Sequence, residues 1–494
     1  MIFSSPKFIL LFLPIAFLGY FFLNRNRLIL AGKAWLVVVS LFFYAYWNIA
    51  YLPLLLVSIL FNFAVGSVLS RGPPSHYVVS PRFVLGTGIA ANLALLGYFK
   101  YADFLIENIN TAFGAGFISP HLLLPLGISF FTFTQIAYLV DSYRGEAKEY
   151  DFLNYALFVT FFPHLIAGPI LHHREMMSQF KSRWTLAVRY RNIALGLFIF
   201  SIGLFKKVVI ADTFAIWANA GFDGANGGAT LDFFSAWATS LSYTFQLYFD
   251  FSGYCDMAIG AALLFNIWLP INFNSPYQAL DIQDFWRRWH ITLSRYLRDY
   301  LYIPLGGNRC ATPRVYFNLM ATFILGGLWH GASWMFVMWG ALHGAALVAH
   351  RIWSGLGLRM PKAVAWLLTF NFINITWVFF RADTLDDALR VVRGMADISS
   401  VIDLPLLGVP TSSLVWGGWF SDHLLRWLPA GLAANVFCFT AILLTLGIIS
   451  QKNSFELMMA GQGVAKLSGA LVLFCVAMYF TMVTTSSIFL YFNF

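Results

Sequence analysis

Long runs of apolar residues alternate with short polar intervals along nearly the whole chain. Each run is as long as a membrane-crossing helix or slightly shorter. The runs lie at residues 8–23, 34–48, 52–69, 83–99, 122–140, 152–171, 192–210, 230–248, 252–270, 315–329, 332–350, 363–380, 432–450 and 468–490. A helix satisfies its backbone hydrogen bonds internally, so these runs predict an all-α polytopic membrane protein.

We expect one integral membrane domain over residues 1–494. The longest polar interval, 381–429, still contains the apolar stretches LPLLGVP and SLVWGGWF, which we interpret as short re-entrant or interfacial pieces. The run at 8–23 follows a lysine, as in a signal peptide, but arginines flank its far side and no small-residue cleavage site is visible. We therefore expect it to be retained as the first membrane helix.

Composition and charge favour a membrane protein over a nucleic-acid-binding protein. Apolar residues make up 59% of the chain, charged residues 11%, and the formal net charge is +9. The basic residues cluster in the intervals 25–33, 172–191, 281–314 and 351–362, which predicts that these loops are cytoplasmic. The acidic interval after Arg381 predicts the opposite side. The four cysteines show neither CxxC nor metal-ligand spacing, so we expect no disulfide framework and no zinc site.

Charge is concentrated between Asp281 and Arg314, and three of the ten histidines lie between Asp281 and Gly344. Six arginines and three aspartates fall in this interval. On a helix, one side carries the polar residues Asp284, Arg287, Arg288, Arg295, Arg298 and Asp299. The other side carries Trp286, Trp289 and His290. The pattern predicts one amphipathic helix at the membrane surface, with the His290 ring facing the interior.

A second histidine follows a pair of glycines. Gly326 and Gly327 stand just before His330, and glycine permits a helix break at membrane depth. The sequence therefore predicts a broken helix beside His330. An imidazole can act as a general base near neutral pH, which makes His330 a candidate catalytic residue. A buried structural histidine is the alternative that the residues alone leave open.

Helix-breaking residues mark two earlier stretches. Pro125 and Gly127 predict a helix start, and Pro163, Gly168 and Pro169 predict a broken helix within the run at 152–171.

Acidic residues within apolar runs form another candidate site. Gln246 and Asp250 are one helical turn apart, and Asp256 follows a predicted break at Ser252 and Gly253. Ionisable groups in a membrane are costly, so a functional role is the usual expectation. A structural role, with the aspartates held by helix amides or by an arginine of the 281–314 interval, is equally compatible with the sequence.

Six phrases of the sequence resemble a known family when read in order. They are LPLGISFFTFTQIAYLVDSYRG, FFPHLIAGPI, YFDFSGYCDMAIG, INFNSPY, FWRRWHITLSRYLRDYLYIPLGGNR and LGGLWHGASWMFVMWGALHG. Together they are similar to the membrane-bound O-acyltransferase (MBOAT) family, in the bacterial branch of the alginate O-acetylation membrane subunit. The motif-bearing core is about residues 122–350. The resemblance implies a helical bundle around a central tunnel, with re-entrant or broken helices.

The resemblance also implies roles for particular histidines. The near-invariant histidine of the family falls on His330 in LWHG, and the second family position falls on His290 in FWRRWH. The resemblance implies that both are catalytic, with His330 acting as a general base or as an acyl carrier. His343 matches a further histidine of this branch, for which a structural or supporting role is implied. His164 departs from the family pattern, in which glutamine is more usual.

The implied activity is an O-acetyltransferase that uses acetyl-CoA as donor and holds no bound cofactor. The basic interval would bind the donor phosphates through Arg287, Arg288, Arg295 and Arg298. Membrane anchoring is the alternative for each arginine. The acceptor implied is a secreted polysaccharide, with alginate first and cellulose or peptidoglycan as alternatives.

The implied location is the bacterial inner membrane. The implied partners are periplasmic SGNH-type acetyltransferase proteins and the machinery for polysaccharide synthesis and export. From a different class, a transporter or flippase would use Asp250, Asp256 and His330 as a proton relay.

Overall fold

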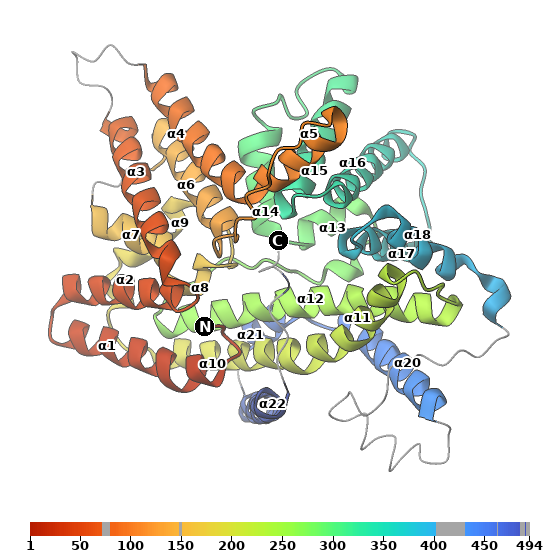
Figure 1. Cartoon of the computed structure of the whole chain (residues 1–494). Helices are drawn as coiled ribbons and strands as arrows, with labels where there is room; N and C mark the ends of the chain where they lie inside the picture. Colours follow the sequence, from red (N-terminus) through yellow and green to blue (C-terminus); the bar gives the residue numbers. More distant parts are fainter. Residues whose placement is uncertain (72–79, 148–150, 402–429, 462, 485–489, 491–494) are drawn as a thin grey trace. The chain divides into compact units, whose positions relative to one another are not determined.

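The structure is a computed structural model that describes residues 1–71, 80–147, 151–401, 430–461, 463–484 and 490 (Figure 1). Its regular elements in these ranges are all helical. The predicted pieces LPLLGVP and SLVWGGWF fall within 402–429, outside the described residues. The chain forms two compact units, one of residues 1–200 and 257–270 (unit 1) and one of residues 201–256 and 271–494 (unit 2).

Unit 1 contains the N-terminal helices. They are η1 (Phe8–Phe12), α1 (Leu13–Arg25), α2 (Ile29–Ala45), α3 (Leu52–Arg71), α4 (Pro81–Leu96), η3 (Gly97–Tyr101), α5 (Ala102–Phe113), α6 (Ile128–Tyr143), α7 (Phe152–Thr160), α8 (Phe162–Leu165), α9 (His173–Phe180) and most of α10 (Tyr190–Phe205). Gly127, with φ +70°, precedes α6, and the run at 152–171 breaks after Thr160. Both features confirm the predictions made from proline and glycine. At the second break the ring of His164 donates from Nε2 to the Phe158 carbonyl oxygen at 2.8 Å.

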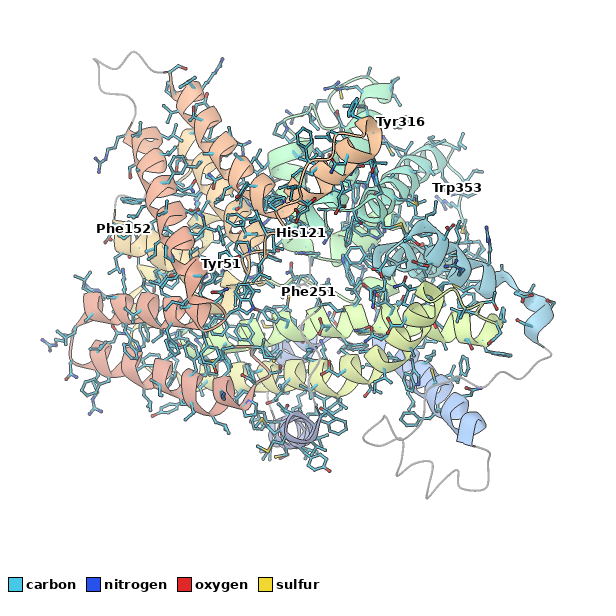
Figure 2. The ribbon with its side chains drawn as sticks, viewed as in Figure 1. Tyr51, His121, Phe152, Phe251, Tyr316 and Trp353 are labelled. Atoms are coloured by element: carbon cyan, nitrogen blue, oxygen red, sulfur yellow. The ribbon has the colours of Figure 1, made fainter. Side chains whose placement is uncertain are left out.

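Besides short 3-10 turns, which occur in both units, unit 2 contains most of the remaining helices. They are η5 (Lys206–Ala211), α11 (Asp212–Asn226), most of α12 (Phe233–Leu264), α13 (Ile282–Arg288), α14 (Ile291–Leu297), η7 (Arg298–Tyr302), α15 (Thr312–His330), α16 (Trp334–Gly355), α17 (Lys362–Arg381), α18 (Leu385–Ala396), α20 (Ala430–Ile449), α21 (Ser454–Met459) and α22 (Val464–Val483). Side chains cover both units densely, as Figure 2 shows.

Seven helical runs in the described ranges are long and apolar enough to cross a membrane. They are Phe8–Arg25, Ile49–Arg71, Pro81–Phe113, Tyr190–Asn226, Trp334–Gly355, Lys362–Arg381 and Val464–Val483. The prediction of an all-α multi-pass membrane protein is confirmed.

The predicted break at Ser252 and Gly253 is wrong, because α12 runs unbroken from Phe233 to Leu264. Gly253 instead permits a close helix contact. A methyl group at this position would lie 2.7 Å from the carbonyl oxygen of Gly203 on α10. Gly253 therefore allows the neighbouring helix α10 to approach closely, and it does not mark a break in α12.

The predicted break at Gly326 and Gly327 is also wrong, since α15 continues to His330. The chain leaves the helix only at Gly331, and α16 then packs against α15 as the second arm of a hairpin (Figure 1). A methyl group on Gly327 would collide with the Phe336 carbonyl oxygen, and one on Gly340 would collide with that of Phe323. The small residues thus set the short distance between the two helices.

Two ion-pair clusters join η5 to α12 inside unit 2. Lys206 Nζ lies 2.7 Å from Asp256 Oδ2, and Lys207 Nζ lies 2.7 Å from Asp250 Oδ1 and 2.8 Å from Asp212 Oδ1. Lys207 and Asp250 are 3% and 1% exposed, so the attraction between them is weakly screened. The structure therefore favours the structural role for both aspartates. Their partners are lysines of η5, however, and not the arginines considered from the sequence.

We expect Gly340→Ala to lower the melting temperature of the purified protein, because the added methyl group collides with the Phe323 carbonyl oxygen. Overpacking of this kind costs about 1–3 kcal/mol of unfolding free energy. Gly355→Ala on the same helix is the matched control, since no atom lies within 4 Å of a methyl group there. Equal melting temperatures for the two variants would contradict the close packing of α15 and α16.

We expect Lys207→Met to reduce the unfolding free energy by about 3–5 kcal/mol, because it leaves the buried Asp250 carboxylate without this cation. Adding Asp250→Asn should restore part of the loss. Thermal melting in detergent measures both effects, and Lys362→Met, at an exposed position, serves as the control. A wild-type melting temperature for Lys207→Met would show that the cluster does not stabilise the fold.

Candidate active site

The backbone at His290 separates two short helices. α13 ends at Arg288, α14 begins at Ile291, and His290 has φ +42° and ψ +54°. The prediction of one continuous amphipathic helix is therefore wrong. A residue other than glycine adopts this left-handed conformation when surrounding contacts enforce it.

Asn272 supplies those contacts from the INFNSPY segment. Its Oδ1 accepts hydrogen bonds from the Thr292 backbone N–H at 3.1 Å and from the Thr292 hydroxyl at 2.7 Å. Its backbone carbonyl accepts from the N–H of Ile291 at 3.0 Å. These bonds satisfy the donors that the first turn of α14 leaves open, so the break is stable in a buried place.

The same asparagine fixes the proton on the His290 ring. His290 is fully buried, as the sequence predicted, and its Nδ1 lies 3.3 Å from Asn272 Oδ1. Because Oδ1 already accepts from a backbone N–H, it is the carbonyl oxygen, and Nδ1 must donate. In the neutral ring Nε2 then carries the lone pair. Phe251 on α12, labelled in Figure 2, packs edge-on against this ring at 4.8 Å between centroids.

His330 is the last residue of α15 and is enclosed by aromatic rings. Its centroid lies 5.0 Å from Trp329, 5.2 Å from Trp339 and 5.3 Å from Phe380. These neighbours come from α15, α16 and α17. Only 3% of the residue is exposed, so water is largely excluded from the ring.

Tryptophans connect the three histidines of this region into one aromatic cluster. The Trp329 ring centroid is 6.3 Å from that of His290 and 5.0 Å from that of His330, and the Trp339 centroid is 5.2 Å from that of His330 and 4.7 Å from that of His343. The structure thus brings the two predicted catalytic histidines into one site. We refer to these five residues as the histidine–tryptophan cluster.

His343 is also held in one tautomer. Its Nδ1 accepts a hydrogen bond from the Trp286 indole N–H at 3.2 Å, so Nε2 carries the proton in the neutral ring. In the described part of the chain, the His343 Nε2 and Trp339 Nε1 atoms are buried and have no hydrogen-bond partner. Trp339 and His343 therefore each present a buried N–H donor without a partner among the described residues.

The four candidate arginines differ in their partners. Arg288 pairs with Asp284 at 2.9 Å, and Arg298 pairs with Asp299 at 2.7 Å. Arg287 is exposed and forms no ion pair with the described residues, and Arg295 is half-buried. α13 thus directs Arg287 outward and the buried Trp286 toward His343.

Sequence reasoning missed Asn272 and Trp339. The polar INFN loop between two apolar stretches could have drawn attention to Asn272. Its partner Thr292 is twenty residues away, however, so no local sequence pattern links the two. Trp339 lies in an apolar run that was interpreted as a spanning helix. Among the described residues, no group of three or more His, Cys, Asp or Glu side chains could hold a metal ion.

Comparison with known proteins identifies the family. Residues 17–383 match the sequence profile described as "MBOAT, membrane-bound O-acyltransferase family". The chain is 50% identical over 527 residues to the peptidoglycan O-acetyltransferase of Helicobacter pylori, covering 100% of this chain and 98% of that protein. It is 44% identical over 406 residues to the probable alginate O-acetylase of Azotobacter vinelandii, covering 80% and 78%.

A third relative is more distant. The teichoic acid D-alanyltransferase of Bacillus subtilis is 27% identical over 280 residues, covering 53% of this chain and 70% of that protein. The family profile spans most of this chain and includes the whole histidine–tryptophan cluster. The protein is a multi-pass membrane acyltransferase that belongs to the membrane-bound O-acyltransferase family.

Proposed function

We propose that the protein transfers acetyl groups from acetyl-CoA to a secreted glycan, and that it does so in the bacterial inner membrane. The observation that carries this proposal is the histidine–tryptophan cluster, in which Trp329 contacts both His290 and His330. Imidazoles in a site without bulk water are suited to acyl transfer, because the lone pair of a neutral ring can accept a proton or an acyl group.

His330 is the proposed catalytic base. It takes the proton from the acceptor hydroxyl as the oxygen attacks the thioester carbonyl carbon. When the tetrahedral intermediate collapses, the carbon–sulfur bond breaks and the proton passes to the CoA thiolate, which leaves as the thiol. In the alternative route the His330 ring nitrogen attacks the thioester carbonyl carbon, the carbon–sulfur bond breaks, and CoA leaves as the thiol with the proton of the ring. The acceptor hydroxyl then attacks the acetyl-imidazole, the carbon–nitrogen bond breaks, and the hydroxyl proton passes to the ring.

The unsatisfied donors of the cluster support this assignment. Trp339 Nε1 and His343 Nε2 are N–H groups, and a thioester carbonyl oxygen accepts hydrogen bonds. That oxygen gains negative charge in the intermediate, so donors fixed in advance stabilise the transition state more than the substrate. His290, whose Nε2 carries the lone pair, is the proposed second proton acceptor.

Access to His330 requires movement. Trp329, Trp339 and Phe380 cover its ring, so a donor can reach it only if at least one of these side chains turns away. The tunnel that the family resemblance implies would open in this way.

Peptidoglycan is the acceptor that we propose. The match to the H. pylori peptidoglycan O-acetyltransferase runs over essentially the full length of both chains, whereas the matches to alginate O-acetylases cover about four-fifths of this chain. Alginate, which the sequence placed first, becomes the second candidate, supported by 44% identity. SGNH-type proteins and the polysaccharide synthesis and export machinery are the proposed partners.

The ion pairs of Asp250 and Asp256 argue against the transporter alternative, in which these aspartates would relay protons. Asp250 and Asp256 are bound to Lys207 and Lys206, which neutralise them. Membership of an acyltransferase family gives the apolar histidines a role that needs no proton path through these aspartates.

We expect His330→Asn to abolish glycan acetylation while the protein stays folded in the membrane, because asparagine keeps polarity but cannot exchange the proton. Ester-linked acetate released by mild base is measured on purified peptidoglycan and, separately, on secreted polysaccharide. His350→Ala, which removes a part-buried histidine of α16, should retain acetylation. An amount of ester-linked acetate equal to that of the wild type in His330→Asn cells would contradict the catalytic role of His330. A loss of acetate from the secreted polysaccharide alone would show that peptidoglycan is not the acceptor.

We expect Arg287→Ala to raise the KM for acetyl-CoA about tenfold, since a hydrogen bond between charged groups contributes about 1.5–3 kcal/mol. Arg288→Ala should change KM less, because that guanidinium already binds Asp284. Initial rates of the purified protein over a range of donor concentrations give both values. An unchanged KM for Arg287→Ala would leave this arginine as a membrane anchor.

A further inference from the structure

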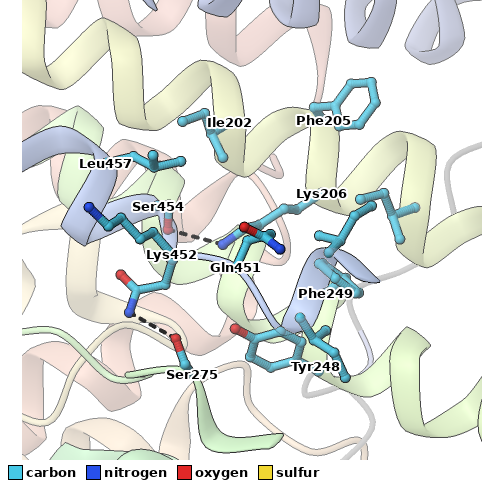
Figure 3. A pocket seen from close by; sticks show the side chains of 14 residues that line it. Ile202, Phe205, Lys206, Tyr248, Phe249, Ser275, Gln451, Lys452, Ser454 and Leu457 are labelled. Atoms are coloured by element: carbon cyan, nitrogen blue, oxygen red, sulfur yellow. Dashed lines mark hydrogen bonds between the residues drawn. The ribbon is translucent and has the colours of Figure 1, made fainter. Parts of the chain in front are cut away.

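A pocket of about 180 Å³ lies in unit 2, bordered by α10, η5, α12 and the turn between α20 and α21 (Figure 3). One part of its wall is apolar and includes Ile202, Phe205, Ile448 and Leu457. The other part is polar. The histidine–tryptophan cluster contributes no residue to this wall, so the pocket is a separate feature of the unit.

Lys206 forms the polar centre of the wall. Its ammonium donates to Asp256 Oδ2 at 2.7 Å and to Ser454 Oγ at 3.0 Å, as the dashed line to Ser454 in Figure 3 shows. An ammonium group has three N–H bonds, so one remains for a ligand. The Tyr248 hydroxyl and the exposed Lys452 add further donors to the same wall.

The charges of the wall select an anion. Lys206 and Lys452 are the charged residues that line the pocket, and no carboxylate does. Asp256 holds Lys206 in place from behind the wall and balances its charge, so Lys452 supplies the net positive charge of the wall. The pocket is large enough for a phosphate group with part of its ester.

An apolar path leads away from the pocket along α20. Ile448 on the wall is 50% exposed, and Leu444, one helical turn earlier, is 65% exposed. In a membrane protein such a face contacts acyl chains. A ligand that reaches both parts therefore has an anionic head and an apolar tail.

We propose that this pocket binds the phosphate of an anionic phospholipid, whose acyl chain lies along Leu444 and Ile448. The site holds the turn between α20 and α21 against η5, because Lys206 contacts both Ser454 and Asp256. Lipid binding at this place is independent of the proposed acetyl transfer.

Native mass spectrometry of the full-length protein in detergent tests the proposal. The protein is titrated with phosphatidylglycerol, phosphatidylcholine or inorganic phosphate. We expect phosphatidylglycerol to bind at least fivefold more tightly than phosphatidylcholine. Lys452→Gln should weaken phosphatidylglycerol binding about fivefold, the contribution of one basic residue near an anionic lipid. Lys362→Gln, which removes the same charge at an exposed position outside the pocket, should bind as the wild type does.

Leu457→Trp provides a second test without any change of charge. The larger ring fills the pocket and should reduce phosphatidylglycerol binding at least tenfold. Equal binding of the two phospholipids, or wild-type binding by both Lys452→Gln and Leu457→Trp, would overturn the proposal. Inorganic phosphate that binds with the same dependence on these variants, while phosphatidylglycerol does not bind, would show a site for free phosphate and would overturn the lipid assignment.

Discussion

A polar group that leaves water must find a partner inside the protein, and this constraint shapes both the fold and the candidate active site. Asn272 shows it most directly, since one side-chain oxygen serves the backbone N–H and the hydroxyl of Thr292 and the ring of His290. Without that oxygen the start of α14 would have buried donors without acceptors, at a cost of about 1–3 kcal/mol each. The bonds that stabilise the helix break are thus the bonds that orient the imidazole.

Burial from water also explains what could be predicted from the sequence. A helix that crosses an apolar phase must carry apolar residues along its whole length, so segments such as 52–69 and 363–380 correspond closely to α3 and α17. Glycine was less informative. Gly253 and Gly327 gave the same local signal as a helix break, but each permits a neighbouring helix to approach. That neighbour comes from another part of the sequence, so no local pattern reveals which role applies.

The same distinction between local and distant information applies to the candidate site. His330 was predicted because a histidine in an apolar segment is conspicuous in the sequence itself, and His290 was predicted from the family motif FWRRWH. The contacts that make them a site were not, since Trp339 and Phe380 reach His330 from two other helices. The different environments of the candidate arginines could not be predicted from the sequence either. Arg288 and Arg287 are adjacent and identical in type, yet an aspartate one turn away neutralises Arg288 alone.

Unpaired N–H groups near His330 lower the stability of the fold, and this cost is consistent with the proposed acyl transfer. Trp339 Nε1 and His343 Nε2 are buried donors without a partner among the described residues, and leaving such donors unpaired costs stability. Under the proposed function, the carbonyl oxygen of an acyl donor would accept from these N–H groups, and donor binding would offset this cost. The same energy difference would favour turning Trp329 or Phe380 away from His330 when a thioester binds, while Trp339 stays in place as a donor. Binding and opening would then be coupled through the hydrogen bonds that the thioester accepts.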